Sequence, residues 1–333
     1  IYVNQVGGQD ELVFDGHSFV AKPEGIVFSL KGFVEDIGIW DAESNSKTYV
    51  SYISEEEELY LSLVLGLRDY VRKCKFQNVV IGISGGIDSA VTACIAVDAL
   101  GPKNVMGLLL PSQYSSGHSV TDGFKLANNL GIEYRIILIH NLFNQYLEEL
   151  KEPFSGLAYD ITEENIQARI RGNMVMAFSN KFKSLALATG NKSELACGYC
   201  TLYGDMCGGL GVIADIYKTQ IYKLAKYINR ENEIIPRNTI LKPPSAELKP
   251  NQKDTDSLPD YEILDQILIR YIEDWESSDE IIRAGFDPKV VRKVLRMVDL
   301  NEYKRRQAAP VLKVSLKAFG TGRRMPIAQG WIE

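Results

Sequence analysis

Long apolar runs are missing from this sequence of 333 residues. No run approaches the roughly 20 residues that a membrane-spanning helix needs, so we expect no membrane association. The first residues, IYVNQVGGQD, also lack the basic start and apolar stretch of a signal peptide. They lack an initiator methionine as well, so we expect a truncated or processed form of a longer protein.

The sequence has no excess of positive charge, and it has few cysteines. Lys and Arg number 37 against 43 Asp and Glu, which gives a net charge of −6. This balance argues against nucleic acid as the main partner. The five cysteines are an odd number in a large chain, which favours free thiols in a reducing compartment such as the cytoplasm over a disulfide framework.

Short apolar runs and helical patterns alternate from residue 78 onward. The expected strands are NVVIGIS, VMGLLLP, YRIILI and SLALATG. This alternation predicts an α/β fold, a Rossmann-like parallel sheet flanked by helices. Ligands bind beyond the carboxyl ends of such strands, so the loops after Ile83, Leu110, Ile139 and Ala188 should converge on one site.

Other segments set further expectations for the elements of the fold. Residues 161–182 predict a long helix capped by Thr162, and residues 288–308 predict another helix. A Pro-rich stretch, 236–258, predicts a long functional or disordered loop. Residues 1–53 predict a short β-rich segment that precedes the main domain, 54–333, whose first helix should be capped by Ser54.

The loop after the first expected strand carries the sharpest chemical signal, SGGIDS at residues 84–89. Backbone N–H groups of a glycine turn at a helix N-terminus bind phosphate, and two serine hydroxyls add donors. Asp88 would repel phosphate unless Mg²⁺ lay between them. The loop is neither a Walker motif nor a dinucleotide fingerprint. A plain glycine turn in which Asp88 caps the helix is the structural alternative.

SGGxDS resembles the loop of the ATP pyrophosphatase superfamily, the adenine nucleotide alpha-hydrolase-like fold. Further segments follow in order: ENIQARIRGN, LATGNKSE, YGDM, YKTQ, LKPPSAEL and EYKRRQ. As an ordered set they resemble the synthetase domain of NAD⁺ synthetases, especially the glutamine-dependent type. The resemblance implies an enzyme that uses ATP and Mg²⁺ to amidate deamido-NAD⁺ with ammonia, releasing AMP and pyrophosphate.

The same resemblance assigns roles to individual residues. Asp88, Glu194 and Lys218 are the expected catalytic residues, and Asp88 and Glu194 are the expected metal ligands. The expected ATP-binding residues are Ser84, Gly85, Gly86, Asp88, Ser89, Thr189, Lys218 and Ser245, with Ser115 and Ser116 as weaker candidates. The expected deamido-NAD⁺ contacts are Asn165, Arg169, Asp205 and Lys304. Without the family, Glu194 would be read as an exposed helix acid and Lys304 as a basic helix end.

Cysteines give the main competing interpretation. Cys197, Cys200 and Cys207 are spaced C-x2-C-x6-C, which would suit zinc, an iron–sulfur cluster or redox chemistry. Some tRNA-thiolating or tRNA-modifying members of the superfamily use such cysteines, so this activity is the alternative function. We expect buried small side chains instead.

The N-terminal segment YVNQVGGQDELVFDG resembles the end of a nitrilase-like glutaminase domain. Such a domain needs a nucleophilic cysteine, and the first cysteine here, Cys74, lies past the segment. We therefore expect residues 1–53 to be a remnant of that domain, either poorly ordered or paired elsewhere. This chain should use free ammonia, whereas the parent protein should use glutamine. The family assembles into dimers or larger rings, so we expect a homo-oligomer.

Overall fold

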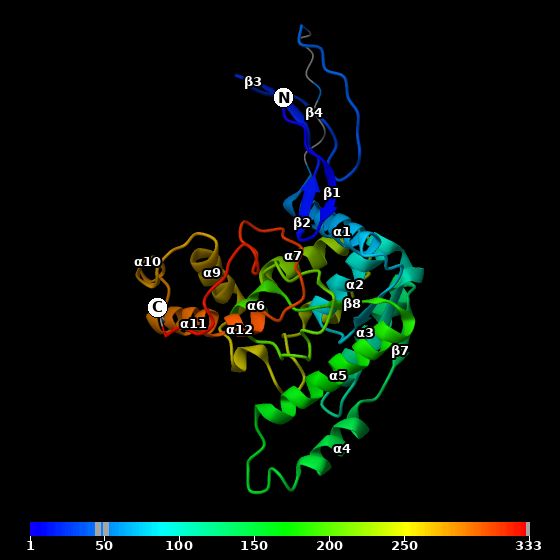
Figure 1. The fold of residues 1–333 in the computed structure, drawn as a ribbon, viewed down its shortest axis with the longest axis vertical. Coiled ribbons are helices and arrows are strands. Elements are labelled where there is room, and N and C mark those ends of the chain that lie inside the picture. Colours follow the sequence, from blue (N-terminus) through cyan, green and yellow to red (C-terminus); the bar gives the residue numbers. More distant parts are fainter. Residues whose placement is uncertain (44–47, 49–52, 331–333) are drawn as a thin grey trace.

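Five short parallel strands form the centre of the protein in a computed structural model that describes residues 1–43, 48 and 53–330 (Figure 1). The strand order is β7-β6-β5-β8-β9. Because β5 pairs with β6 on one side and β8 on the other, the order reverses at β5. The predicted parallel α/β sheet is therefore confirmed. The strands are β5 (Val79–Gly82), β6 (Val105–Leu109), β7 (Glu133–Ile136), β8 (Leu185–Ala188) and β9 (Leu210–Gly211).

Helices cover both faces of this sheet, because successive strand residues point to opposite sides. Val79 and Ile81 join a core with α1, α2 and α7, whereas Val80 joins another with α4 and α5. The helices of these two layers are α1 (Glu55–Lys73), α2 (Ile87–Leu100), α3 (Gly117–Leu130), α4 (His140–Leu150), α5 (Ile161–Phe182) and α7 (Lys218–Ile228), with the 3₁₀ turn η1 (Pro102–Asn104) after α2.

A third apolar core lies beside the sheet and is built mostly from the C-terminal third of the chain (Figure 1). Its helices are α6 (Lys192–Cys197), α9 (Tyr261–Ile272), α10 (Ser278–Arg283), α11 (Pro288–Leu300) and α12 (Glu302–Arg305). None of the helices among the described residues combines the length and apolar character needed to traverse a lipid bilayer.

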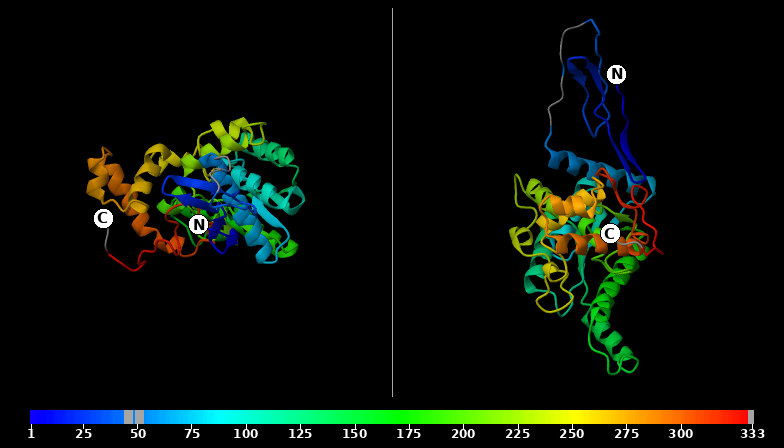
Figure 2. Two further views of the ribbon diagram at one scale, coloured as in Figure 1. Left: turned by 90° about the horizontal axis from the view of Figure 1, so that it is seen from above. Right: turned by 90° about the vertical axis from the view of Figure 1, so that its left-hand side faces the viewer.

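The N-terminal segment forms two antiparallel hairpins, as its β-rich pattern predicts. They are β1 (Val6–Gln9) with β2 (Leu12–Asp15), and β3 (Phe19–Lys22) with β4 (Gly25–Ser29). The first hairpin packs on α1, where the amide of Gly8 donates to Asp69 at 2.9 Å. It also meets the C-terminal segment, where the amide of Lys313 donates to the carbonyl of Glu11 at 2.7 Å. The second hairpin extends away from the sheet (Figure 2). Residues 44–47 and 49–52 of the predicted segment 1–53 lie outside the described residues.

Three local expectations were wrong or incomplete. Helix α5 begins as predicted, but Asp160 caps it, because its carboxylate accepts from the amide of Thr162 and Glu163 completes the capping box. The expected helix 288–308 is broken at Asn301, whose side-chain amide donates to the carbonyls of Cys197 and Met297. Strand β7 is shorter than the run YRIILI. Ser54 caps α1 as predicted.

The long loop between α7 and α9 is ordered in the structure and carries two short helices. They are α8 (Arg237–Leu241) and the 3₁₀ turn η2 (Asp254–Asp256).

Candidate functional site

The SGGIDS loop joins β5 to α2 at the point where the strand order reverses. Gly85 has φ +77°, and a Cβ atom there would lie 2.1 Å from the backbone oxygen of Ser119. Only glycine fits this turn, which presses against the start of α3. The hydroxyls of Ser84 and Ser89 lie 3.1 Å apart, and the amide of Gly86 donates to the Ser84 hydroxyl at 3.2 Å. The loop therefore presents hydroxyls and amides at a helix N-terminus, as an anion site requires.

Asp88 stands in the first turn of α2, but it does not cap that helix. Its Oδ2 accepts from the Lys218 ammonium at 2.6 Å, and its Oδ1 accepts from the Asn191 side-chain amide at 2.9 Å. These partners lie more than 100 residues away in the sequence. The cap interpretation is therefore wrong, and the carboxylate faces the loops that follow β8 and β9.

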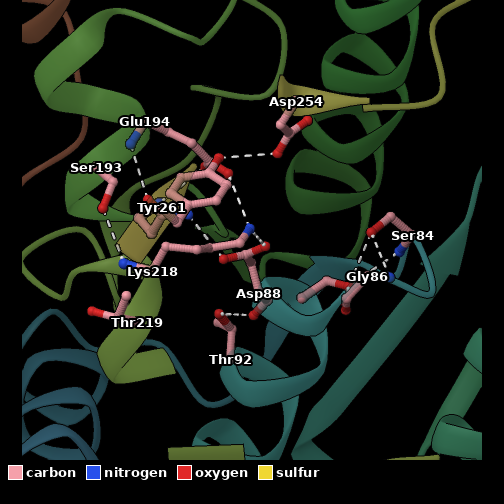
Figure 3. A network of polar contacts seen from close by, with 12 residues as sticks. Ser84, Gly86, Asp88, Thr92, Ser193, Glu194, Lys218, Thr219, Asp254 and Tyr261 are labelled. Carbon is pink, nitrogen blue, oxygen red and sulfur yellow. Dashed lines mark hydrogen bonds and ion pairs between the residues drawn. The ribbon is translucent and has the colours of Figure 1, made fainter. Parts of the chain in front are cut away.

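Glu194 and Lys218 complete a cluster at the carboxyl edge of the sheet (Figure 3). The Lys218 ammonium lies 3.4 Å from Glu194 Oε1, and the Glu194 side chain is 19% exposed. Asn191 caps α6: its side-chain Oδ1 accepts from the backbone amide of Glu194. The backbone amide of Asn191 in turn donates to Glu194 Oε2. One asparagine thus orients both Asp88 and Glu194. The three predicted catalytic residues are brought together in the structure, and Glu194 is not the exposed acid of the alternative interpretation.

The charges of this cluster change the proton affinities within it. Burial raises the pKa of Glu194 to about 8, although Lys218 opposes the shift. Burial alone would lower the pKa of Lys218, but Asp88 and Glu194 outweigh it, so that pKa is raised. Lys218 is therefore held as an ammonium, while Glu194 gains affinity for a proton in the absence of another cation.

Lys218 is itself held by a buried scaffold. Its amide donates to the Ser193 hydroxyl at 3.0 Å, and that hydroxyl donates to Asp265 at 2.5 Å. Asp265 on α9 also accepts from the amide of Thr219 at 2.8 Å. The ammonium lies 5.2 Å from the centre of the Tyr261 ring. These contacts fix the start of α7 relative to α6 and so position the Lys218 ammonium.

The loop after α7 lies against the SGGIDS loop and the start of α3. The Thr239 hydroxyl donates to the carbonyl of Gly85 at 3.3 Å. Glu247 accepts from the hydroxyls of Ser116 and Ser119 at the start of α3, at 3.0 and 2.6 Å. Ser245 is exposed, and its hydroxyl accepts from the amide of Glu247.

Three other predicted nucleotide contacts lie after the ends of two parallel strands. Thr189 is half-buried and follows β8 directly. The Ser115 hydroxyl accepts from the amide of Ser112 after β6, whereas Ser116 caps α3. Both segments lie on the carboxyl side of the sheet, where the SGGIDS loop also follows its strand.

The four residues expected to contact deamido-NAD⁺ are gathered around one segment, 198–205. Thr201 donates through its hydroxyl to Asn165 and through its amide to Asp205, both at 2.7 Å. Arg169 donates to the carbonyl of Leu202, and the Lys304 ammonium donates to the carbonyls of Gly198 and Cys200. Burial raises the pKa of Asp205. In this structure Lys304 thus binds the C-terminal end of α6 and is not a solvated helix end.

A small cavity of about 20 Å³ connects the two groups of residues, since both Glu194 and Asp205 line it. Cys200 also lines it and is half-buried, as is Cys207, whereas Cys197 is buried. Burial raises the pKa of Cys197 and of Cys200 to about 12, so neither is a ready thiolate. Among the described residues, the side chains that converge as a metal-type group are Asp15, His17 and Glu58.

The donor set at Asp88 and Glu194 fits a magnesium ion. Both carboxylates already converge on one cationic group, the Lys218 ammonium. Mg²⁺ is usually held by one or two carboxylates together with phosphate oxygens, and the SGGIDS loop beside Asp88 is the expected phosphate site. The residues present therefore suit this ion.

Sequence reasoning missed two important polar residues of this region. Asn191 lies inside the quoted segment LATGNKSE, and the N-x-x-E pattern of a capping box could have found it. Lys192 is fully buried, and its ammonium reaches Asp215 at 3.0 Å and Glu273 at 2.7 Å. No local pattern predicts such a buried ion pair, since its partners come from distant segments.

Comparisons with a family model and with curated proteins identify the same family. The NAD synthase family model matches residues 59–308. A glutamine-dependent NAD(+) synthetase from Synechocystis sp. is 52% identical over 338 residues, which cover 99% of this chain and 61% of that protein. The chain thus spans about three fifths of the length of this curated relative.

Two solved structures are also similar. A glutamine-dependent NAD+ synthetase from Acinetobacter baumannii, solved in complex with ADP, gives a TM-score of 0.71 at 44% identity and covers 99% of this chain and 62% of that one. An NMN synthetase from Francisella tularensis gives a TM-score of 0.65 at 25% identity, covering 80% of this chain and all of that one. The fold of this chain, which includes the parallel sheet and the N-terminal hairpins, is therefore similar to that of a solved structure over 99% of its length.

Proposed function

Because this chain belongs to the NAD synthase family, we propose that it catalyses the ATP-dependent amidation of deamido-NAD⁺ to NAD⁺. The observation that carries the proposal is the convergence of Asp88, Glu194 and Lys218 beside the SGGIDS loop. In this reaction the nicotinate carboxylate attacks the α-phosphorus of ATP and pyrophosphate leaves. Ammonia then attacks the adenylated acyl carbon and AMP leaves.

The protein supplies positions and charges for this reaction, and no nucleophile of its own. Amides and hydroxyls of Ser84, Gly85, Gly86 and Ser89 hold the phosphates that depart. The Lys218 ammonium, fixed between two carboxylates, offers its charge to the developing pyrophosphate. Asp88 and Glu194 would hold Mg²⁺, which when bound would neutralise part of the negative charge of the phosphates.

Substrate contacts follow from the second group of residues. Asn165, Arg169, Asp205 and Lys304 surround segment 198–205, and we assign the nicotinate and ribose end of deamido-NAD⁺ to this side. The cavity lined by Glu194 and Asp205 lies between the two groups. Thr189 and Ser245 are assigned to ATP, with the loop 236–258 covering the site and excluding water from the hydrolysable adenylate.

The nitrogen source depends on the parent protein. We assign residues 1–53 to the end of a glutaminase domain, which is supported by relatives named as glutamine-dependent that cover 99% of the chain. No cysteine lies within residues 1–53. We therefore expect these 333 residues to use ammonium and not glutamine. Five free thiols fit a reducing, cytoplasmic location.

A single assay tests the proposed reaction. The chain is incubated with ATP, Mg²⁺ and deamido-NAD⁺, with either ammonium or glutamine, and NAD⁺, AMP and pyrophosphate are measured. We expect equal amounts of all three with ammonium and none with glutamine. Lys218→Met should lower the rate by about 100-fold or more, whereas Lys223→Met, an exposed lysine on the same helix, should not.

Two outcomes would replace this proposal. Turnover of the mononucleotide in preference to the dinucleotide would place the chain with the NMN synthetase to which it is similar. Adenylation of tRNA without NAD⁺ formation would support the alternative, a tRNA-modifying enzyme, although the high thiol pKa values of Cys197 and Cys200 argue against it.

We also propose that a second copy of the chain covers the arm formed by α4 and the start of α5. This arm projects from the sheet (Figures 1 and 2) and exposes large apolar side chains. They are Leu142, Tyr146, Leu157, Tyr159 and Ile161, which are 42% to 73% exposed. Exposed apolar patches of this kind mark protein interfaces. Leu157→Glu with Ile161→Glu should turn a dimer into a monomer in analytical ultracentrifugation.

A further inference from the structure

Glu247 is a carboxylate that the proposed chemistry does not use. It lies in the loop between α8 and α9 and contacts the start of α3. The Ser119 hydroxyl donates to Glu247 Oε1 at 2.6 Å, and the Ser116 hydroxyl donates to the same oxygen at 3.0 Å. The backbone amide of Ser116 donates to Oε2 at 3.3 Å. Hydrogen bonds to a charged acceptor are stronger than neutral ones. Glu247 therefore docks the loop on α3, although Ser119 lies 128 residues away in the sequence.

Two cationic side chains lie near the same contact. The Lys242 ammonium, from the start of the loop, donates to the buried Ser119 hydroxyl at 2.8 Å. Burial lowers the pKa of Lys242 and of Arg171, and Glu247 opposes both shifts. Glu247 thus contributes its charge as well as its hydrogen bonds to this junction between the loop, α3 and α5.

The backbone at Glu247 also indicates a residue that is held in place. Its φ is +50°, in the left-handed region. Residues other than glycine rarely adopt this conformation, and they keep it only where surrounding contacts hold it. The next residue, Leu248, accepts through its carbonyl from the Gln167 side chain on α5 at 2.8 Å. The turn therefore contacts α3 through one residue and α5 through the next.

The loop connects the two groups of candidate site residues. At one end the Thr239 hydroxyl donates to the carbonyl of Gly85 in the SGGIDS loop. At the other end the side-chain amide of Gln252 lies 3.5 Å from the hydroxyl of Tyr199, in segment 198–205. Glu247 lies between these ends, so its contacts hold the middle of the segment that runs from one group to the other.

We propose that Glu247 is a positioning residue: its hydrogen bonds to Ser116 and Ser119 hold the 242–258 loop over the adenylate until ammonia attacks. This inference rests on the proposed function, in which the loop excludes water. With the loop undocked, water would attack the acyl carbon of the adenylate. The bond from that carbon to the phosphate oxygen would break, so deamido-NAD⁺ and AMP would leave, protons would pass to solvent, and no NAD⁺ would form. Glu247 thus couples the use of ATP to amide formation.

The first readout measures docking of the loop without any reaction. Hydrogen exchange of residues 242–258 is compared for the intact wild-type chain, Glu247→Ala, Ser119→Ala and the double variant. Glu247→Ala should speed exchange by about 10- to 100-fold, because it removes the charged hydrogen bonds to α3. The double variant should exchange little faster than Glu247→Ala, since both changes break the same contact. Glu247→Gln, which keeps an acceptor oxygen for the hydroxyls, should lie between the wild type and Glu247→Ala.

The second readout is the ratio of AMP to NAD⁺ formed from ATP, deamido-NAD⁺ and limiting ammonium. The wild-type chain should release equal amounts of the two products. Glu247→Ala should raise the ratio by about threefold or more, and Glu247→Gln should restore part of the coupling. A merely structural defect would lower both products together and leave their ratio unchanged.

Lys249→Met is the matched control. Lys249 belongs to the same loop, and its ammonium lies 3.2 Å from Glu164 on α5, but its side chain is 43% exposed. Exposed ion pairs contribute little, so this variant should keep the wild-type exchange and product ratio. Melting temperatures identify any variant that is merely unfolded.

Several results overturn the inference. They are unchanged exchange or an unchanged product ratio in folded Glu247→Ala, equal acceleration in Lys249→Met, and independent effects of the Ser119 and Glu247 changes. Hydrogen exchange requires no NAD⁺ formation. A wild-type chain whose loop is protected through Glu247 but which makes no NAD⁺ would therefore refute the proposed function and leave the docking contact in place.

Discussion

Asn191 is the residue whose replacement best separates the two contributions of the site, helix stability and carboxylate orientation. Its side-chain oxygen caps α6. Its side-chain Nδ2 donates to Asp88 Oδ1 at 2.9 Å. Asn191→Ala removes both contacts. Asn191→Ser keeps an oxygen that can cap the helix but removes the amide donor. The two variants therefore differ in the cap and share the loss at Asp88.

The magnitudes follow from these contacts. Loss of a helix cap costs about 1 kcal/mol, and loss of a hydrogen bond to a charged group costs about 1.5–3 kcal/mol. Asn191→Ala should thus lower the free energy of unfolding by roughly 2.5–4 kcal/mol, and Asn191→Ser by about 1 kcal/mol less. Both should raise the Mg²⁺ concentration needed for half-maximal activity by about tenfold or more, since both remove one of the two contacts that orient the Asp88 carboxylate.

Urea unfolding measures the first quantity, and Mg²⁺ titration of NAD⁺ formation measures the second. If Asn191→Ser regained the wild-type Mg²⁺ dependence while Asn191→Ala did not, the cap and not the amide would be responsible. That result would refute the claim that Asn191 orients Asp88. Equal Mg²⁺ dependence in the two variants, with unequal stability, supports it.

Three further predictions concern ATP binding and the stability of the fold. Gly85→Ala should abolish ATP binding in calorimetry and lower the melting temperature, because Gly85 has φ +77° and its Cβ would meet a backbone oxygen at 2.1 Å; wild-type ATP affinity would contradict this. The raised pKa of Glu194, about 8 against an ordinary 4.5, stabilises the ligand-free fold fully below pH 4.5, and this contribution is lost as the pH rises through 8. Urea unfolding between pH 5 and pH 8 should therefore show a pH-dependent loss that Glu194→Gln reduces, and an unchanged slope in that variant would count against the assignment. Lys192→Met should cost about 3–5 kcal/mol in urea unfolding, since it leaves Asp215 and Glu273 buried without their cation; a loss below about 1 kcal/mol would show that the pair is not needed.

Local sequence predicted much of the fold and the turn of the SGGIDS loop. The alternation of apolar runs and helices gave the parallel sheet, because both patterns depend on residues close together in the chain. The glycines of the SGGIDS loop predicted a tight turn between strand and helix for the same reason. Errors arose where two local signals competed: Asp160 and Thr162 both suit a helix cap, and only the backbone geometry selects Asp160.

The sequence by itself thus determined most of the elements, the turn of the SGGIDS loop and, through an ordered set of segments, the family. Only the tertiary structure decided which charged side chains lie close enough to form ion pairs and shift each other's pKa values. Asp88 is 103 residues from Asn191 and 130 from Lys218, so their contacts depend on the strand order at the reversal point. The buried ion pair of Lys192 with Asp215 could not be predicted either, because the burial of a charged side chain is set by what packs around it. Local patterns specify the chain's geometry, whereas the electrostatics of a site arise from residues that only folding brings together.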